Sequence, residues 1–238
     1  MKGYDKLSVN RQMLLDLRFR EGTGITTQDI AKPHHEPVVL VNTPTWANLV
    51  SGLPVLQLSG VVPREYIEID NADSLDMDFM SGDFSLGGWF NWSAGDDSQI
   101  TIGRYELDVG GWELYLYDDP NHYLTLRHHH SGTIVDGHPR SACGSTGWTQ
   151  GTWHFFGVSR SGVSQSHYRN GVALPTTCTT ILVDPETCAQ DLVIGVRFTK
   201  GDNSFKGQLD GFRVWDRSLS ASEWLSIFEM EKHWYGVS

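Results

Sequence analysis

The sequence has no apolar stretch long enough to cross a membrane and no run of basic residues. A membrane-spanning helix needs about 20 consecutive apolar residues, and no segment of the 238 residues approaches that length. Eighteen Lys and Arg residues against 29 Asp and Glu residues give a net charge of −11. Because nucleic acids and anionic lipids require a concentrated basic face, the charge pattern argues against nucleic-acid partners and against membrane insertion.

Cysteine is scarce, and the common catalytic motifs are missing. The three thiols, Cys143, Cys178 and Cys188, cannot all pair within one chain, which excludes a dense disulfide framework. A bridge between Cys178 and Cys188 would contribute about 3 kcal/mol in the chain-entropy model, and three reduced thiols are an equal alternative. The sequence contains no G-x-S-x-G elbow, no P-loop and no C-x-x-C zinc spacing.

The N-terminal 13 residues are polar and show no hydrophobic period. They predict an arm over residues 1–13 ahead of a single domain over residues 14–238. Residues 1–5 lack the apolar core of a secretory signal. We therefore expect that the chain is not exported by that route or that its signal has been trimmed.

The rest of the chain is rich in Trp (9) and Gly (25), and its apolar residues alternate with polar ones. Leu15, Leu17 and Phe19 alternate with charged neighbours, as in a half-buried strand. Short β runs between Gly, Asn, Asp and Pro clusters predict an all-β, two-sheet antiparallel sandwich or jelly roll. Further strands are predicted over residues 38–41, 55–59, 66–69, 84–92, 99–103, 112–117, 123–127, 153–159, 166–169, 192–196 and 211–215. Large rings in the alternating strands are expected to be buried on the inner face, namely Trp89, Trp112, Trp153 and Trp215.

One short C-terminal helix is predicted near the end of the chain. Ser220 and Glu223 have the spacing of a capping box, and Gly236 suits the end of the helix. An apolar stripe follows the cap and is expected to pack on the sandwich; it comprises Trp224, Leu225, Phe228 and Trp234.

From residue 15 to residue 223 the chain resembles the laminin-G-like, concanavalin A-like jelly-roll domains. The landmarks occur in the family's order, and the C-terminal pair is the most specific. This resemblance implies the jelly-roll fold but no single function, because lectins, adhesion modules and virion proteins share the scaffold. The matching segments are LDLRFREGTG (15–24), YIEI (66–69), FSLGGWF (84–90), WELYL (112–116), TWHFFGVSR (152–160), YRNG (168–171), FKGQLDGFRVW (205–215) and RSLSASE (217–223).

Residues 68–73 also resemble the E-I-D-x-x-E signature of laminarinase-type glycosidases, in which alternate strand residues place carboxylates on one face. Here the last position is Asp73, whose shorter side chain reaches less far than Glu. The laminin-G-like pattern places its own Y-I-E-I strand at the same point. We therefore interpret Glu68 as ordinary strand chemistry and expect a domain that is not an enzyme.

A structural calcium ion is a second expectation from the resemblance, since sandwiches of this type often hold an ion where the first and last strands meet. Asp210 is then the best single ligand, with Asp16 and the Gly60 carbonyl as further candidates. The alternative is that Asp210 bonds backbone amides at a strand edge. His128 and His130 have the alternation of a divalent-metal pair, but a solvated strand end is the favoured interpretation.

Aromatic and polar residues gather in the loops that follow the central strands. Aromatic rings stack on the C–H faces of sugars, and carboxylates and amides bind the hydroxyls. The same residue types suit a protein–protein interface, and the sequence leaves both open. The candidate ligand-binding residues are Tyr105, Tyr117, Asp118, Asp119, Asn121, His122, Tyr123 and Trp148.

These features favour a non-catalytic jelly-roll domain that acts through its surface. We expect a virion structural or decoration protein on the particle surface, with capsid or tail subunits as partners and the arm docking onto a neighbour. The alternative is an extracellular, calcium-dependent lectin that binds glycans. A laminarinase-like enzyme is a third reading, and a homo-oligomer is left open.

Overall fold

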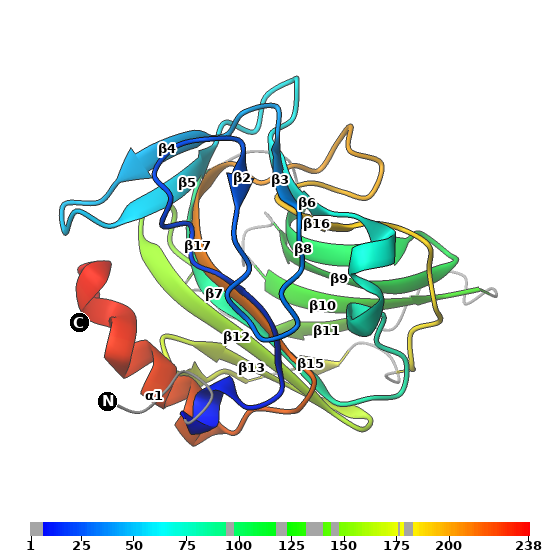
Figure 1. The fold of residues 1–238 in the computed structure, drawn as a ribbon. Helices are drawn as coiled ribbons and strands as arrows, with labels where there is room; N and C mark the ends of the chain where they lie inside the picture. The colour runs from blue at the N-terminus through cyan, green and yellow to red at the C-terminus, as the bar shows by residue number, and fades with distance from the viewer. Residues whose placement is uncertain are drawn as a thin grey trace.

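The computed structural model describes residues 7–93, 98–117, 123–131, 140–143, 148–175, 177–178 and 183–238. Two antiparallel β-sheets stack face to face, and a short helix covers the outer face of one of them (Figure 1). The predicted all-β jelly-roll sandwich with a short C-terminal helix is confirmed.

The eight-stranded sheet has the order β14-β13-β12-β7-β17-β5-β4, and β1 pairs separately with β17. Its centre is formed by three nine-residue strands whose register places successive side chains on opposite faces. The strands are β1 (Met13–Leu17), β4 (Thr45–Asn48), β5 (Pro54–Leu58), β7 (Phe84–Trp92), β12 (Trp153–Ser161), β13 (Ser164–Arg169), β14 (Val172–Ala173) and β17 (Gly207–Trp215).

The nine-stranded sheet has the order β15-β11-β10-β9-β8-β16-β6-β3-β2. Its long meander of β8, β9 and β10 places sequence neighbours side by side, which positions the candidate site described below. The strands are β2 (Thr26–Thr27), β3 (Val38–Val41), β6 (Tyr66–Ile69), β8 (Ser98–Glu106), β9 (Gly110–Tyr117), β10 (Tyr123–His130), β11 (Arg140–Cys143), β15 (Thr177–Cys178) and β16 (Leu192–Ile194).

Between the sheets lies an apolar core that includes Trp92, Trp112 and Trp148. Only Trp112 of the four predicted inner-face indoles belongs to it. Trp89, Trp153, Trp215 and the helix residue Trp224 form a second cluster on the outer face of the eight-stranded sheet, which corrects the prediction. The helix buries that outer face as well, so burial alone does not mark the inside of the sandwich.

Helix α1 (Ala221–Glu231) begins with the predicted capping box, in which the Ser220 side chain accepts a hydrogen bond from the Glu223 backbone N–H. The indole of Trp224 lies over the glycines of β7 and β12, where a Cβ atom at Gly87 or Gly157 would come within 2.7 Å of the ring. These glycines are therefore required by close packing. Trp224, Ile227 and Phe228 are buried, whereas Leu225 and Trp234 are exposed, which corrects the predicted stripe.

Four short 3₁₀ segments complete the described elements: η2 (Ser8–Asn10), η3 (Asn71–Asp73), η4 (Leu75–Met77) and η5 (Lys232–Trp234). The first of them lies within the predicted arm. The Trp215 indole N–H donates to the Val9 carbonyl oxygen at 2.7 Å, and Arg217 donates to the Arg11 carbonyl oxygen. Residues 8–13 therefore pack on β17 as part of the fold.

Two further predictions from the sequence concern membrane-spanning segments and the pairing of the cysteines. Within the described part of the chain, no helix is long and apolar enough to cross a membrane. Cys188 is a free, buried thiol, so it does not form the bridge to Cys178 that was considered from the sequence. The side chains of Cys143 and Cys178 lie outside the described residues.

Candidate functional site

The outer face of the nine-stranded sheet carries a row of polar and aromatic side chains from β9 and β10. In an antiparallel pair, residues directly opposite each other place their side chains on the same face. The register pairs Tyr117 with Tyr123 and Glu113 with Arg127. Because Leu114 and Leu116 point into the core, the alternating residues point outward and form one continuous surface.

A hollow of about 230 Å³ opens in this surface. Its walls come from β8, β9 and β10 and from the connection between β16 and β17. Tyr117 is 40% exposed at the rim, whereas Tyr105 and Tyr115 are buried in the walls. The described residues that line it are Ile100, Tyr105, Glu113, Tyr115, Tyr117, Arg127, Arg197 and Asn203.

Glu113 is the carboxylate of the hollow. It contacts His129 Nε2 at 2.9 Å and Arg127 Nη1 at 3.6 Å, and Tyr105 hydrogen-bonds to it. The Tyr105 ring stacks on His129 with the ring centroids 4.7 Å apart. Burial and the nearby carboxylate raise the pKa of Tyr105, and burial lowers the pKa of His129. Both rings are therefore neutral at pH 7.

Arg197 closes the hollow from the connection between β16 and β17. Its guanidinium lies over the Phe198 ring, 5.6 Å from the centroid, and contacts Asp202 at 3.3 Å. Burial acts to lower the pKa of Arg197, but Tyr105 and Asp202 outweigh it and raise the pKa. Arg197 is thus a fixed cation in the wall of the hollow.

This combination of groups suits binding of a polar molecule with an apolar face. Tyr117 offers an exposed ring face and a phenol hydroxyl, and the arginines, Glu113 and Asn203 offer donors and acceptors. A pyranose has both kinds of surface. Glu113 is the one carboxylate among the described lining residues, whereas most glycoside hydrolases use a pair of carboxyl groups.

The structure brings together only part of the predicted ligand set. Tyr117 and Tyr123 are opposite each other on β9 and β10. Trp148 is fully buried in the core beside Phe90, so its ring offers no face to a ligand, and this prediction is corrected. Tyr105 is a buried wall residue. Asp118, Asp119, Asn121 and His122 lie outside the described residues.

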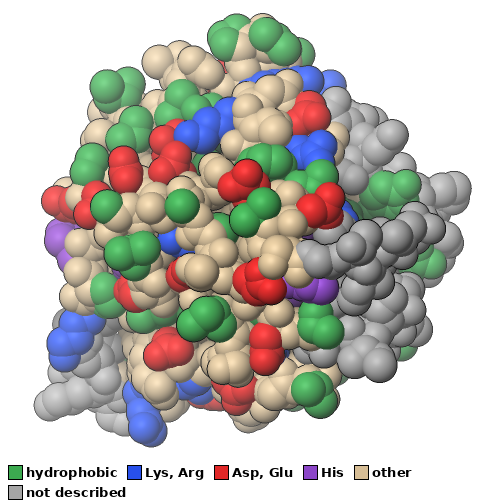
Figure 2. All heavy atoms as spheres, turned by 90° about the vertical axis from the view of Figure 1, so that its right-hand side faces the viewer, with side chains coloured by type: hydrophobic (Ala, Val, Ile, Leu, Met, Phe, Trp, Pro, Cys, Tyr) green, Lys and Arg blue, Asp and Glu red, His purple; other side chains and the backbone are tan. Residues whose placement is uncertain are grey.

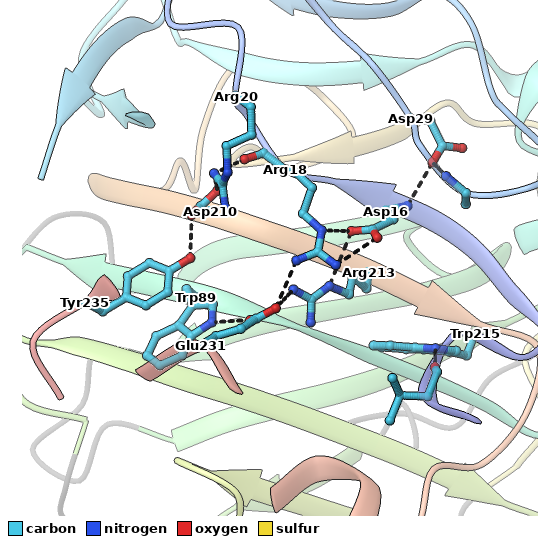
Figure 3. Close-up of polar contacts among 12 residues, drawn as sticks. Asp16, Arg18, Arg20, Asp29, Trp89, Asp210, Arg213, Trp215, Glu231 and Tyr235 are labelled. Atoms are coloured by element: carbon cyan, nitrogen blue, oxygen red, sulfur yellow. Dashed lines mark hydrogen bonds and ion pairs between the residues drawn. The ribbon is translucent and has the colours of Figure 1, made fainter. Parts of the chain in front are cut away.

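The predicted calcium ligands lie elsewhere, on the outer face of the eight-stranded sheet (Figure 3). Asp210 contacts Arg20 Nη1 at 2.8 Å and accepts a hydrogen bond from the Tyr235 hydroxyl. Asp16 contacts Arg18 and Arg213. Each carboxylate is therefore bound to arginine in place of the oxygen-rich shell that calcium prefers.

Arg18 and Arg213 also form ion pairs that hold the C-terminal helix to the sheet. Glu231 of α1 lies between Arg18 and Arg213 and accepts a hydrogen bond from the Trp89 indole at 2.9 Å (Figure 3). Burial acts to raise the pKa of Glu231, but the two arginine charges outweigh it and lower the pKa. Burial raises the pKa of Asp210 to about 6, against the lowering effect of its arginine.

The third predicted ligand is the carbonyl of Gly60, which lies in the loop between β5 and β6. It accepts hydrogen bonds from Arg64 and from the Ser204 hydroxyl. Among the described residues, no group of three or more His, Cys, Asp or Glu side chains is placed to hold a metal ion. Calcium binding stays a prediction, for which a melting curve with and without EDTA is the test.

The histidines at the end of β10 have partners within the protein. His128 is buried against Phe84, and its Nδ1 contacts the Val183 carbonyl oxygen at 2.8 Å. Burial lowers its pKa to about 4. His130 lies at the strand end, where its Nδ1 is 3.4 Å from the Ser131 carbonyl oxygen. The two imidazoles therefore have separate surroundings.

The glycosidase-like segment does not form a carboxylate row on one strand. Strand β6 ends at Ile69, and Asp70 instead caps η3 by accepting a hydrogen bond from the Ala72 backbone N–H. Glu68 lies on the outer face of the sheet and contacts Lys200 Nζ at 3.2 Å. Asp73 is exposed within η3, beyond the end of the strand.

The sequence interpretation missed Glu113, Arg127 and Arg197. Glu113 and Arg127 are strand residues, whereas the ligand-binding residues predicted from the sequence were assigned to loops. Their opposite charges at facing positions were a usable signal once β9 and β10 were paired. Arg197 is 70 residues further along the chain, and only the fold brings it to the hollow.

Comparison with known proteins gives this architecture a family. The model of the concanavalin A-like lectin/glucanases superfamily matches residues 64–223, about two thirds of the chain. The chain belongs to this superfamily, which confirms the predicted resemblance. No curated protein matches the sequence.

Solved structures with the same fold include toxin binding domains. The binding domain of Paraclostridial Mosquitocidal Protein 1 has a TM-score of 0.71 at 12% identity, covering 97% of this chain and 56% of that one. The botulinum neurotoxin DC binding domain in complex with rat synaptotagmin II has a TM-score of 0.67 at 13% identity, covering 94% and 52%. A structure of botulinum neurotoxin type C, whose cell entry depends on interaction with two ganglioside molecules, has a TM-score of 0.70 at 13% identity. It covers 94% of this chain and 52% of that one. This chain thus spans about half the length of these structures, and the likeness shows the fold.

Proposed function

We propose that this protein is a non-catalytic binding domain that takes a saccharide in the hollow of the nine-stranded sheet. The observation that carries the proposal is the lining itself: three tyrosines, two arginines, one carboxylate and one amide around a space of about 230 Å³. A pocket of this size suits one or two sugar units, with the rest of a chain lying along the sheet. One similar structure belongs to botulinum neurotoxin type C, whose cell entry depends on interaction with two ganglioside molecules, and another is the botulinum neurotoxin DC binding domain in complex with SialylT; both are consistent with a saccharide.

A protein partner is the main competing occupant of the hollow, because one similar domain was solved in complex with rat synaptotagmin II. The hollow favours a sugar because it is small, and because polar groups line it from every side. Protein interfaces instead bury broad patches of about 800 Å² on each partner. The surface viewed in Figure 2 carries acidic side chains with basic ones between them and offers no broad apolar patch among its described residues.

The test uses a glycan array followed by calorimetry with the strongest hit. Tyr117→Ala removes the exposed ring at the rim of the hollow and should weaken binding about fivefold, because a stacked ring contributes on the order of 1 kcal/mol. Trp234→Ala is the matched control, since Trp234 is 44% exposed at the other side of the molecule. Loss of binding in the Trp234 variant but not in the Tyr117 variant would contradict this site, and an array without competable hits would favour a protein partner.

For its location we propose the surface of a virus particle, with an extracellular lectin as the alternative. Domains of this scaffold serve in both settings. Residues 8–13 pack on the fold, so an attachment test should remove residues 1–6 alone. Loss of attachment to purified particles with an unchanged melting temperature would support a docking arm, and unchanged attachment would contradict it.

A further inference from the structure

Arg127 in the hollow is a strongly charged group with little to bind inside the protein. Among the described residues it forms an ion pair with Glu113, where Nη1 and Oε1 are 3.6 Å apart. Hydrogen bonds between nitrogen and oxygen span about 2.7 to 3.2 Å, so this contact is an ion pair without a hydrogen bond. Within the described residues, the buried Arg127 Nε has no hydrogen-bond partner either.

Glu113 is meanwhile bound from its other side. His129 Nε2 lies at 2.9 Å from the same oxygen, and Tyr105 hydrogen-bonds to the carboxylate. Glu113 therefore already has a closer partner than Arg127. The guanidinium keeps donors available on the side that faces the hollow, where 21% of the side chain is exposed.

The charge of the lining points the same way. Two guanidinium groups, those of Arg127 and Arg197, face one carboxylate among the described lining residues, although the whole chain carries a net charge of −11. Arg197 is already paired with Asp202 at 3.3 Å, so Arg127, which shares Glu113 with His129, is the less completely paired of the two cations. A planar guanidinium binds a carboxylate through two parallel hydrogen bonds, so an anionic group on a ligand would complete the pairing of Arg127.

We propose that the hollow selects saccharides that carry an anionic substituent and that Arg127 is the residue that recognises it. This inference rests on the proposed function, since it names the kind of sugar that the same site takes. Tyr115 and Tyr117 would contact the ring of the sugar, and Arg127 would bind the anionic group, with Arg197 nearby. A carboxylate and a sulfate ester are two chemical forms that such a group takes on sugars.

The test compares charged sugars with neutral partners, by calorimetry on the full chain. The probes are trigalacturonate against its methyl ester, sialyllactose against lactose, and lactose 6′-sulfate against lactose. We expect the wild type to bind at least one charged member about tenfold more tightly than its neutral partner, since hydrogen bonds to charged groups contribute about 1.5 to 3 kcal/mol. The first two pairs report on a carboxylate and the third on a sulfate.

Arg127→Gln should abolish this preference, because it should weaken binding of the charged sugar about tenfold more than binding of the neutral one. Arg127→Lys keeps the charge but loses the paired donors, so it should retain part of the preference. Arg11→Gln, which removes an exposed arginine from the N-terminal segment, is the matched control and should behave as the wild type. The Lys variant keeps the test informative if the Gln variant folds poorly.

The outcomes separate this inference from the proposed function. Equal affinity for charged and neutral sugars, with binding that still depends on Tyr117, would overturn the role of Arg127 and leave the saccharide site standing. A charge preference that survives in both Arg127 variants would also overturn it. Absence of binding to every probe and to the glycan array would contradict both proposals.

Discussion

Arginine–carboxylate contacts occur on the outer faces of both sheets, but the two faces differ in how completely the arginines are bound. On the eight-stranded sheet, Arg18 and Arg213 surround Glu231 under the C-terminal helix, with contacts shorter than 3.0 Å (Figure 3). On the nine-stranded sheet, Arg127 and Glu113 are 3.6 Å apart at an open hollow. The same residue types thus fasten a helix on one face and leave donors for a ligand on the other.

The covering helix accounts for the difference. It removes its face of the eight-stranded sheet from water, and a buried charge without a partner is costly. The described charged groups under the helix therefore have close partners: Arg18 and Arg213 contact carboxylates, and Glu231 contacts both arginines and the Trp89 indole N–H. The open face of the nine-stranded sheet is solvated, where a loosely paired guanidinium costs little. We infer that an incompletely paired charge is tolerated where solvent or a ligand can reach it.

The largest expected effect is on the covered face. Glu231→Gln removes the carboxylate between Arg18 and Arg213 and should lower the free energy of unfolding by about 3 kcal/mol, because it leaves two arginines to share the single carboxylate of Asp16. Urea denaturation at pH 7 measures the change. Glu229→Gln, on the same helix with a half-exposed side chain paired to Lys232, should cost less than about 0.5 kcal/mol. Equal effects of the two substitutions would contradict the contrast between the faces.

Acid should lower the stability of the protein through three buried histidines. Burial lowers the pKa of His128 to about 4, of His154 to about 4 and of His167 to about 3. Because these pKa values lie below the unfolded value of about 6.5, the unfolded chain binds more protons. Stability should then be full above pH 6.5 and fall as the pH drops toward 4.

Asp210 acts in the opposite direction, since its pKa is raised to about 6 and its contribution to stability improves as the pH falls through that value. Urea midpoints at pH 7.0, 5.5 and 4.5 measure the net change, which we expect to follow the three histidines. Asp210→Asn removes the opposing group and should leave the loss of stability in acid in place. A midpoint that rises steadily from pH 7.0 to 4.5 would contradict the buried, neutral state of the histidines.

The smallest expected effect on stability is at the hollow. Arg127→Gln should change the free energy of unfolding by less than about 1 kcal/mol, because the side chain makes one long ion pair and no hydrogen bond within the described residues. Arg213→Gln, under the helix, is the matched comparison and should cost several times more. If the two substitutions cost the same, the open face is as dependent on its ion pairs as the covered one.

The strands were readable from sequence because alternation marks them directly. The predicted strands over residues 38–41, 66–69 and 84–92 coincide with β3, β6 and β7. The side of the sheet that each indole faces was not readable. Strand β7 is buried along nearly its whole length on both faces, because the helix covers the outer one, so a period of two gives no sign of which face is inside.

The binding site was readable only in part. Tyr117 stood out as an aromatic residue at a strand end, and the structure places it at the rim of the hollow. Trp148 stood out for the same reason but fills the core, because its indole packs against Phe90 and His154. Composition identifies residues able to bind a sugar, and only the tertiary packing decides which of them reach the surface.

The docking of helix α1 and of the Val9 segment has a practical meaning for presentation of the domain. Both the C-terminal helix and the first described residues lie on the side of the eight-stranded sheet (Figure 1), opposite the face that carries the hollow. A neighbouring domain, a particle or a sensor surface joined at either end would therefore sit behind the sandwich. Immobilised in this way, the protein would hold its hollow toward the medium, with the entrance unobstructed.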